Sequence, residues 1–119
     1  MRDARDRMGK GMGQTILDCH ECSDACRRCL QHCLRTGGMH AEARHIRALC
    51  DCAEACQFAA SFLGRESEHS VRASAICAEA CDACALSCER VPDDEEMRHC
   101  AATCRRCAHS CRDMAGMRG

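Results

Sequence analysis

Residues 22–33, CSDACRRCLQHC, place cysteine at successive steps of four, three and four residues. These steps follow the heptad spacing of a helix whose apolar side chains share one face, so the four thiols form a stripe along one side of a helix. The residues between them are mostly good helix formers, and neither Gly nor Pro interrupts the run. The stretch therefore predicts a helix with a cysteine-lined inner face.

The same spacing recurs three more times along the chain. Residues 77–88, CAEACDACALSC, and residues 100–111, CAATCRRCAHSC, repeat it in full. Residues 52–63, CAEACQFAASFL, keep the first two cysteines and continue the stripe with Ala59 and Leu63. The pattern predicts four helices, over roughly residues 14–36, 40–63, 68–90 and 94–115.

Short breaks separate these predicted helices and decide how they are arranged. The breaks are Thr36-Gly37-Gly38, Gly64 with Ser67, and Val91-Pro92-Asp93-Asp94. Short connections make successive helices antiparallel. We therefore expect an all-α fold, an antiparallel up-down-up-down four-helix bundle with a Cys-lined core, over residues 14–119. Residues 1–13 are expected to form a flexible N-terminal tail or a short extra helix.

The composition favours an interior built largely from sulfur. The 119 residues include 16 Cys, 19 Ala and 7 Met, but only 13 Val, Ile, Leu and Phe together. So few large apolar side chains cannot fill a conventional core. We expect six of them to close one end of the bundle as an apolar plug, made of Ile16, Leu17, Phe58, Phe62, Leu63 and Val71.

Charge and composition exclude two classes of partner. Lys and Arg number 17 against 18 Asp and Glu, which gives a net charge of −1, and the chain has no Trp or Tyr. Binding to nucleic acid or to an anionic membrane needs a basic excess, so neither is expected. No stretch approaches the roughly 20 apolar residues that span a bilayer. The first residues, MRDARDRMGKGMG, lack the apolar run of a secretory signal, so we expect a cytoplasmic protein with reduced thiols.

A disulfide scaffold and a metal-binding core are the two interpretations of so many cysteines. Cysteines three or four residues apart on one helix have Cβ atoms about 5–6 Å apart, whereas a disulfide needs about 3.8 Å. Disulfides between helices remain geometrically possible. Thiolates bind soft metals, chiefly Cu(I), zinc and iron–sulfur clusters.

Converging stripes of thiols predict a protein that binds multiple Cu(I) ions, of the order of one per thiol, because that ratio nearly neutralises the thiolates. Pairs four residues apart, such as Cys22 with Cys26, are expected to share an ion. Cys19 extends the first stripe, and Cys50 lies at the edge of the second. The candidate ligands are Cys19, Cys22, Cys26, Cys29, Cys33, Cys50, Cys52, Cys56, Cys77, Cys81, Cys84, Cys88, Cys100, Cys104, Cys107 and Cys111.

Two other functions use the same thiols. An iron–sulfur electron-transfer protein would take four cysteines per cluster, and a metallothionein-like protein would sequester zinc or cadmium. No residue pattern resembles a general base beside an activated nucleophile, so we do not expect an enzyme.

Histidine and methionine gather at the end opposite the apolar plug. Met39, His45, Met97 and His99 are candidate ligands there, although core packing is an alternative role for His45 and Met97. His40 lies at the same end. The other four histidines lie off the stripes and are expected to face solvent: His20, His32, His69 and His109.

The four cysteine-striped helices resemble the bacterial four-helix-bundle copper storage proteins over about residues 14–115. The shared motifs are CAEAC at 52–56 and 77–81, HC at 99–100, and the closing CRRCAHSCRDMA. The resemblance implies a cytosolic homotetramer that exchanges Cu(I) at one open end, with histidine at the mouth, for which His99, His45 and His40 are candidates. A copper chaperone or a copper exporter is the kind of partner with which such a store would exchange ions.

Overall fold

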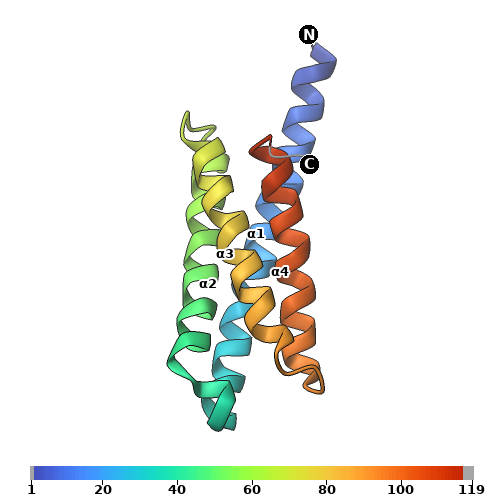
Figure 1. Ribbon diagram of the computed structural model, residues 1–119. Helices are drawn as coiled ribbons and strands as arrows, with labels where there is room; N and C mark the ends of the chain where they lie inside the picture. Colours follow the sequence, from blue (N-terminus) through green and yellow to red (C-terminus); the bar gives the residue numbers. More distant parts are fainter. Residues whose placement is uncertain (1, 117–119) are drawn as a thin grey trace.

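The computed structural model describes residues 2–116, with the side chains of residues 11–116. The elements are α1 (Arg2–Thr36), the short 3₁₀ helix η1 (Gly38–Ala41), α2 (Ala43–Gly64), α3 (Ser70–Glu89) and α4 (Glu95–Met114). Successive long helices run in opposite directions (Figure 1). Helices α1 and α3 each pack against both α2 and α4. The predicted up-down-up-down bundle is therefore confirmed.

The N-terminal segment belongs to the longest helix. Helix α1 begins at Arg2, so residues 2–13 continue the helix that carries the first cysteine stripe. Its first turns extend beyond the other three helices, at the end where α2 connects to α3 (Figure 1). Met1 and residues 117–119 lie outside the described residues. The predicted bundle domain, residues 14–119, includes residues 117–119.

The first break is made by two glycines, as the sequence predicts. Gly37 and Gly38 have φ angles of 74° and 58°, in the left-handed region that favours glycine. The backbone N–H of Gly37 donates to the carbonyl of Cys33 at 3.0 Å, which ends α1 with a left-handed cap. The chain then turns through η1. Extended backbone at Glu42, with φ −58° and ψ 137°, separates η1 from α2, so the helix expected over residues 40–63 begins only at Ala43.

The other two breaks use different devices. Gly64 is the last residue of α2, and the left-handed residue of this turn is Glu66, with φ 52°. The N–H of Ser67 donates to the carbonyl of Phe62 at 3.0 Å, which closes the helix end. Asp94 is the N-cap of α4, and its side chain accepts a hydrogen bond of 3.0 Å from the N–H of Met97.

The core consists mainly of cysteine and alanine. Fifteen of the sixteen cysteines are buried, and the sixteenth, Cys50, is half-buried. Only Leu49 and Leu63 among the large aliphatic and aromatic side chains are buried. Sulfur and alanine side chains therefore fill the interior, as the composition predicts.

The apolar plug is smaller than predicted. Leu63 is buried and Ile16 and Phe62 are half-buried, but Leu17, Phe58 and Val71 are exposed. The reason is helical phase, because Phe58 precedes the stripe position of Ala59 by one residue and Leu17 lies midway between the stripe positions 15 and 19. Both side chains are therefore rotated away from the bundle axis. Of the six predicted plug residues, only Leu63 is fully buried.

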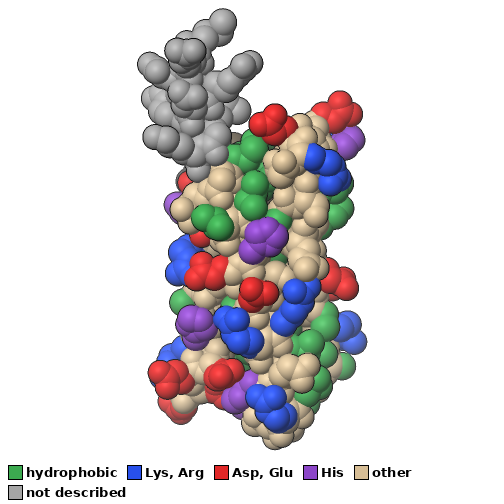
Figure 2. Space-filling model, turned by 180° about the vertical axis from the view of Figure 1, so that it is seen from behind, with side chains coloured by type: hydrophobic (Ala, Val, Ile, Leu, Met, Phe, Trp, Pro, Cys, Tyr) green, Lys and Arg blue, Asp and Glu red, His purple; other side chains and the backbone are tan. Residues whose placement is uncertain are grey.

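The outer surface carries charges of both signs. On the face shown in Figure 2, acidic and basic side chains are interspersed. Ion pairs join neighbouring helices, as between Arg105 of α4 and Glu89 of α3 at 2.8 Å. No helix of residues 2–116 is both long and apolar enough to cross a membrane.

Candidate metal centre

Thiols from all four long helices meet along the axis of the bundle. The shortest contact between two cysteine sulfurs, 3.6 Å, joins Cys52 of α2 to Cys81 of α3. Cys22 of α1 lies 3.7 Å from Cys104 of α4. All sixteen cysteines are free thiols, because a disulfide would need sulfurs about 2 Å apart. The disulfide interpretation is therefore wrong for this structure.

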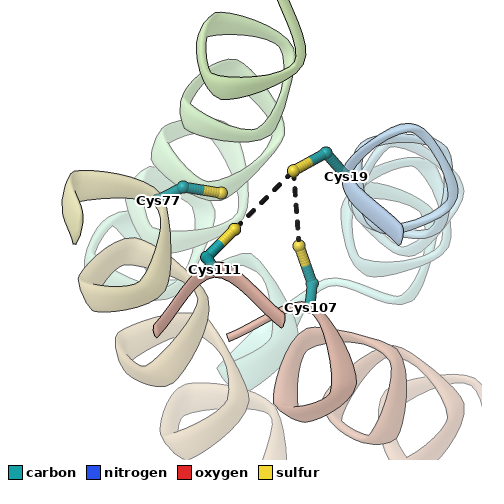
Figure 3. A group of neighbouring side chains, drawn as sticks. All are labelled: Cys19, Cys77, Cys107 and Cys111. Carbon is teal, nitrogen blue, oxygen red and sulfur yellow. Dashed lines mark hydrogen bonds between the residues drawn. The ribbon is translucent and has the colours of Figure 1, made fainter. Parts of the chain in front are cut away.

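The sulfur atoms form overlapping groups of four. Within each group all sulfurs lie within 4.8 Å of one another. Figure 3 shows the group nearest the plugged end, in which Cys19, Cys77, Cys107 and Cys111 point toward one another from α1, α3 and α4. Further groups are Cys56, Cys77, Cys81 and Cys107; Cys22, Cys52, Cys56 and Cys81; Cys22, Cys26, Cys52 and Cys104; and Cys26, Cys84, Cys100 and Cys104.

These distances suit thiolate ligands that share metal ions. A metal–thiolate bond is about 2.3 Å long, so two sulfurs on one ion lie at most about 4.6 Å apart. Neighbouring groups have members in common, such as Cys56 and Cys81, so the groups form a continuous chain rather than isolated sites. Most of the close pairs join different helices. Pairs within one helix also occur, as between Cys77 and Cys81 at 3.9 Å, which agrees with the expected pairs four residues apart.

Several thiols of the core are held in the protonated form. The pKa values of Cys19, Cys56 and Cys81 are raised. The main cause is hydrogen bonding with neighbouring thiols, in which Cys107 has the largest effect, and burial adds to it. At Cys33 burial is the main cause, and it raises the pKa to about 11. Many thiolates cannot coexist in a low-dielectric interior without compensating charge. Cations that replace the protons would supply that charge.

At the end that carries η1, the ligand types change. The sulfur of Met97 lies 3.6 Å from the sulfurs of both Cys29 and Cys33, and Nε2 of His45 lies 3.3 Å from the sulfur of Cys33. All four side chains are buried. We call Cys29, Cys33, His45 and Met97 the mixed-ligand group. It brings together two of the four His and Met candidates, His45 and Met97.

A serine fixes the ring of His45. The Oγ of Ser87 lies 2.6 Å from Nδ1 of His45, on the opposite side of the ring from Cys33. Burial lowers the pKa of His45, which favours the neutral imidazole that a metal needs. A neutral ring whose Nδ1 donates to Ser87 presents the lone pair of Nε2 to the thiols. No pattern in the sequence identifies Ser87 for this role.

Three other candidates lie outside the buried core cluster. Cys50 is half-buried and does not belong to the core cluster. Met39 and His99 are exposed. His99 lies one residue off the stripe that holds Met97 and Cys100, which turns its side chain to the surface beside Arg28 and Glu96.

The expectation for the remaining histidines is right for three of the four. His20, His69 and His109 are exposed, but His32 is half-buried and lies 2.8 Å from Asp94. Its partner is more than sixty residues away in the sequence, so helical spacing gives no signal for this contact.

Comparison with known proteins identifies the family. The family model for the copper storage protein, Csp, matches residues 8–116 of this chain. The structure of the Nmul_A1745 protein from Nitrosospira multiformis is similar with a TM-score of 0.85 and 40% identity, over 92% of this chain and 99% of that one.

Two solved structures that contain copper are also similar. The Cu(I)-bound copper storage protein BsCsp3, of Bacillus subtilis, has a TM-score of 0.83 and 31% identity, over 88% of this chain and 98% of its own. A cytosolic copper storage protein from Streptomyces lividans, in a structure with five coppers, has a TM-score of 0.82 and 28% identity, over 96% and 99%. Since the family model spans nearly the whole chain, the protein belongs to the copper storage protein family.

Proposed function

We propose that this protein stores Cu(I), holding multiple ions on the thiolates of its fifteen buried cysteines. The observation that carries the proposal is the continuous chain of overlapping four-sulfur groups along the bundle axis. Two similar structures, from Bacillus subtilis and Streptomyces lividans, contain copper.

Charge favours Cu(I) over the other soft metals. One Cu(I) per thiolate leaves the core neutral, and each ion that binds displaces one thiol proton. Four thiolates around one Zn²⁺ would leave two negative charges at every site in a low-dielectric interior. Iron–sulfur clusters usually accept hydrogen bonds from backbone N–H groups, and in these helices the backbone donors are already used within the helix.

The mixed-ligand group is the part of the site where we propose that ions enter and leave. It lies in the last two turns of α1 and the first turns of α2 and α4, next to η1. The thioether of Met97 and the imidazole of His45 remain good ligands without carrying negative charge, so they bind Cu(I) less tightly than a thiolate and allow exchange. Met39 and His99 are proposed as outer ligands on the surface of the same end.

The capacity for Cu(I) tests the proposal. The reduced protein would be titrated with Cu(I) without oxygen, against a strong chelator, and we expect saturation at the order of one ion per buried thiol. Replacing the shared ligand in Cys81→Ser should lower the capacity, because Cys81 belongs to two of the groups. The matched variant Cys50→Ser, outside the core cluster, should keep it. Saturation at only one or two ions would contradict storage.

The proposal extends to the compartment in which the protein acts and to the proteins with which it exchanges copper. We propose that it acts in the cytoplasm, as a binding protein without turnover, and exchanges copper with a chaperone or an exporter. Reduced thiols are stable in that compartment, which is what the store requires.

We also propose that the chain assembles as a homotetramer in which the α2–α3 face forms one of the interfaces, pairing two copies. A groove of about 790 Å³ lies there, with the exposed side chains of Phe58 and Ile76 in its lining. Arg44 and Arg47 line one part of the groove and Glu54 another, so a second copy packed antiparallel would place opposite charges together.

Sedimentation of the metal-free protein tests the assembly. We expect a tetramer, and we expect Ile76→Glu to dissociate it, because a buried interface does not tolerate an unpaired charge. The control Leu34→Glu changes an exposed leucine on α1 and should leave the assembly intact. A monomer at all concentrations of the unmodified protein would overturn the proposal.

A further inference from the structure

A second cluster of ligand-type side chains lies outside the thiol core, at the end that carries η1. His32 of α1 and His40 of η1 both approach the same oxygen, Oδ2 of Asp94, which is the N-cap of α4. The distances from their Nε2 atoms to this oxygen are 2.8 and 2.9 Å. The two rings are nearly perpendicular, with centroids 5.7 Å apart. Three elements that are far apart in the sequence thus bring two imidazoles and one carboxylate together.

The spacing of these atoms is that of ligands around one metal ion. Zinc binds imidazole nitrogen and carboxylate oxygen at about 2.0–2.2 Å, so two ligands on one ion lie about 2.9–3.4 Å apart, depending on the angle at the metal. The two nitrogen-to-oxygen distances in the cluster, 2.8 and 2.9 Å, lie just below and at the short end of that range. A movement of a few tenths of an ångström by each ring would therefore bring both nitrogens to the spacing that a shared ion requires.

Two further features favour a site that is held in place and open to water. The other oxygen of Asp94 accepts the N–H of Met97 at 3.0 Å, so the carboxylate is oriented by the backbone. The side chains of His32, His40 and Asp94 are 24%, 15% and 17% exposed, which leaves room for water as a fourth ligand.

We propose that His32, His40 and Asp94 form a binding site for one divalent cation of borderline softness, and that this cation is Zn²⁺. Two imidazoles and a carboxylate suit such an ion, whereas Cu(I) prefers the thiolates of the core. The site is chemically separate from the copper store, although His32 is adjacent to Cys33 in the sequence. An ion bound there ties η1 and α1 to the start of α4.

The experiment uses the full chain with its thiols already loaded with Cu(I), so that the core cannot take up zinc. Titration with Zn²⁺ by calorimetry, without oxygen, should show about one tight site per chain. The double variant His32→Gln, His40→Gln should lose that site, with affinity reduced at least about tenfold. Its capacity for Cu(I), measured first, should be unchanged because all sixteen cysteines remain.

The control is His109→Gln, which removes an exposed histidine that pairs with a single carboxylate, Asp113. This variant should bind zinc as the unmodified chain does. In parallel, Co²⁺ should give ligand-field bands without a thiolate charge-transfer band. Equal zinc binding by the double variant, no zinc binding by the unmodified chain, or a thiolate band with Co²⁺ would each overturn the proposal. A failed copper titration would instead count against storage, so the two proposals fail separately.

Discussion

Cysteine serves as both packing group and ligand in this protein. Cys81 has no exposed surface and lies 3.6 Å from Cys52 and 3.7 Å from Cys56. A thiol is small and apolar enough to pack beside alanine, yet it binds a soft metal once its proton is lost. Because the sulfurs already approach one another in the metal-free core, loading needs little rearrangement of the helices.

Ser87 is expected to control copper uptake without touching copper. In Ser87→Ala the ring of His45 loses the partner of Nδ1, so its tautomer and orientation are no longer fixed. We expect transfer of the first Cu(I) ions from a chelator to slow by about tenfold, while the total capacity is unchanged. Stopped-flow transfer measurements check this. Ser110→Ala, which removes a hydrogen bond to Asp18 at the other end, should leave the rate unchanged.

The stability of the metal-free protein is expected to fall at high pH. The pKa of Cys33 is raised by burial from its ordinary 9.0 to about 11. Between those values the unfolded chain loses the proton and the folded chain keeps it, so the stabilisation present below pH 9.0 is lost as the pH rises toward 11. Urea unfolding across this range should show a falling midpoint. Protein loaded with Cu(I) has no such proton to lose, and an equal fall in the loaded form would contradict the explanation.

Among the helices, α2 differs from the rest in what its stripe carries. It keeps Cys52 and Cys56 but continues with Ala59 and Leu63, and Leu49 precedes them. All five are buried, so the stripe is continuous although only two of these positions hold sulfur. Because Ala59 and Leu63 take the next two stripe positions, the row of thiols on α2 ends before its last turn, and hydrocarbon closes this end.

The stability of the closed end should depend on Leu63. Leu63→Ala removes a fully buried side chain and is expected to lower the free energy of unfolding by about 2–5 kcal/mol. The Cu(I) capacity should stay the same, because no ligand is lost. Chemical denaturation of the metal-free protein measures the first effect. The matched variant Leu17→Ala, at a leucine that is 62% exposed, should change stability by less than about 0.5 kcal/mol.

At the scale of the whole molecule, the two ends of the bundle have different chemistry. The plugged end has a group of four thiols behind Leu63, and the end with η1 has the mixed-ligand group and, outside it, the cluster around Asp94. At the end with η1, the imidazole of His45 and the thioether of Met97 lie against the last thiols of α1. This difference between the ends agrees with the proposal that Cu(I) enters and leaves through the end with η1.

Loading with Cu(I) is expected to stabilise the entire bundle. Each group of thiols joins several helices, so bound ions cross-link the fold and add binding energy to folding energy. The unfolding temperature should rise with each increment of copper, and protons should be released in proportion to the ions bound. Removing copper with a strong chelator should restore the original unfolding temperature. A transition that does not move with loading would show that copper binds outside the core.

The sequence by itself determined the four helices, their antiparallel order and the face that each buries. Heptad spacing dictates which side chains share a stripe, and the breaks at Gly37-Gly38, Ser67 and Pro92 leave only short connections. Because the cysteines follow this spacing, fifteen of the sixteen are buried, as predicted. The phase of a stripe likewise accounts for the exposed position of His99, which periodicity could have identified.

Only the tertiary structure decided which side chains from different helices meet. The contact of His45 with Ser87 spans 42 residues, and that of His32 with Asp94 spans 62. Such contacts depend on the relative rotation and axial shift of packed helices, which side-chain packing over the whole interface fixes and which no local pattern encodes. For the same reason the helical repeat predicted a thiol-lined core, whereas the particular sets of four sulfurs follow from how the four helices are aligned along their common axis.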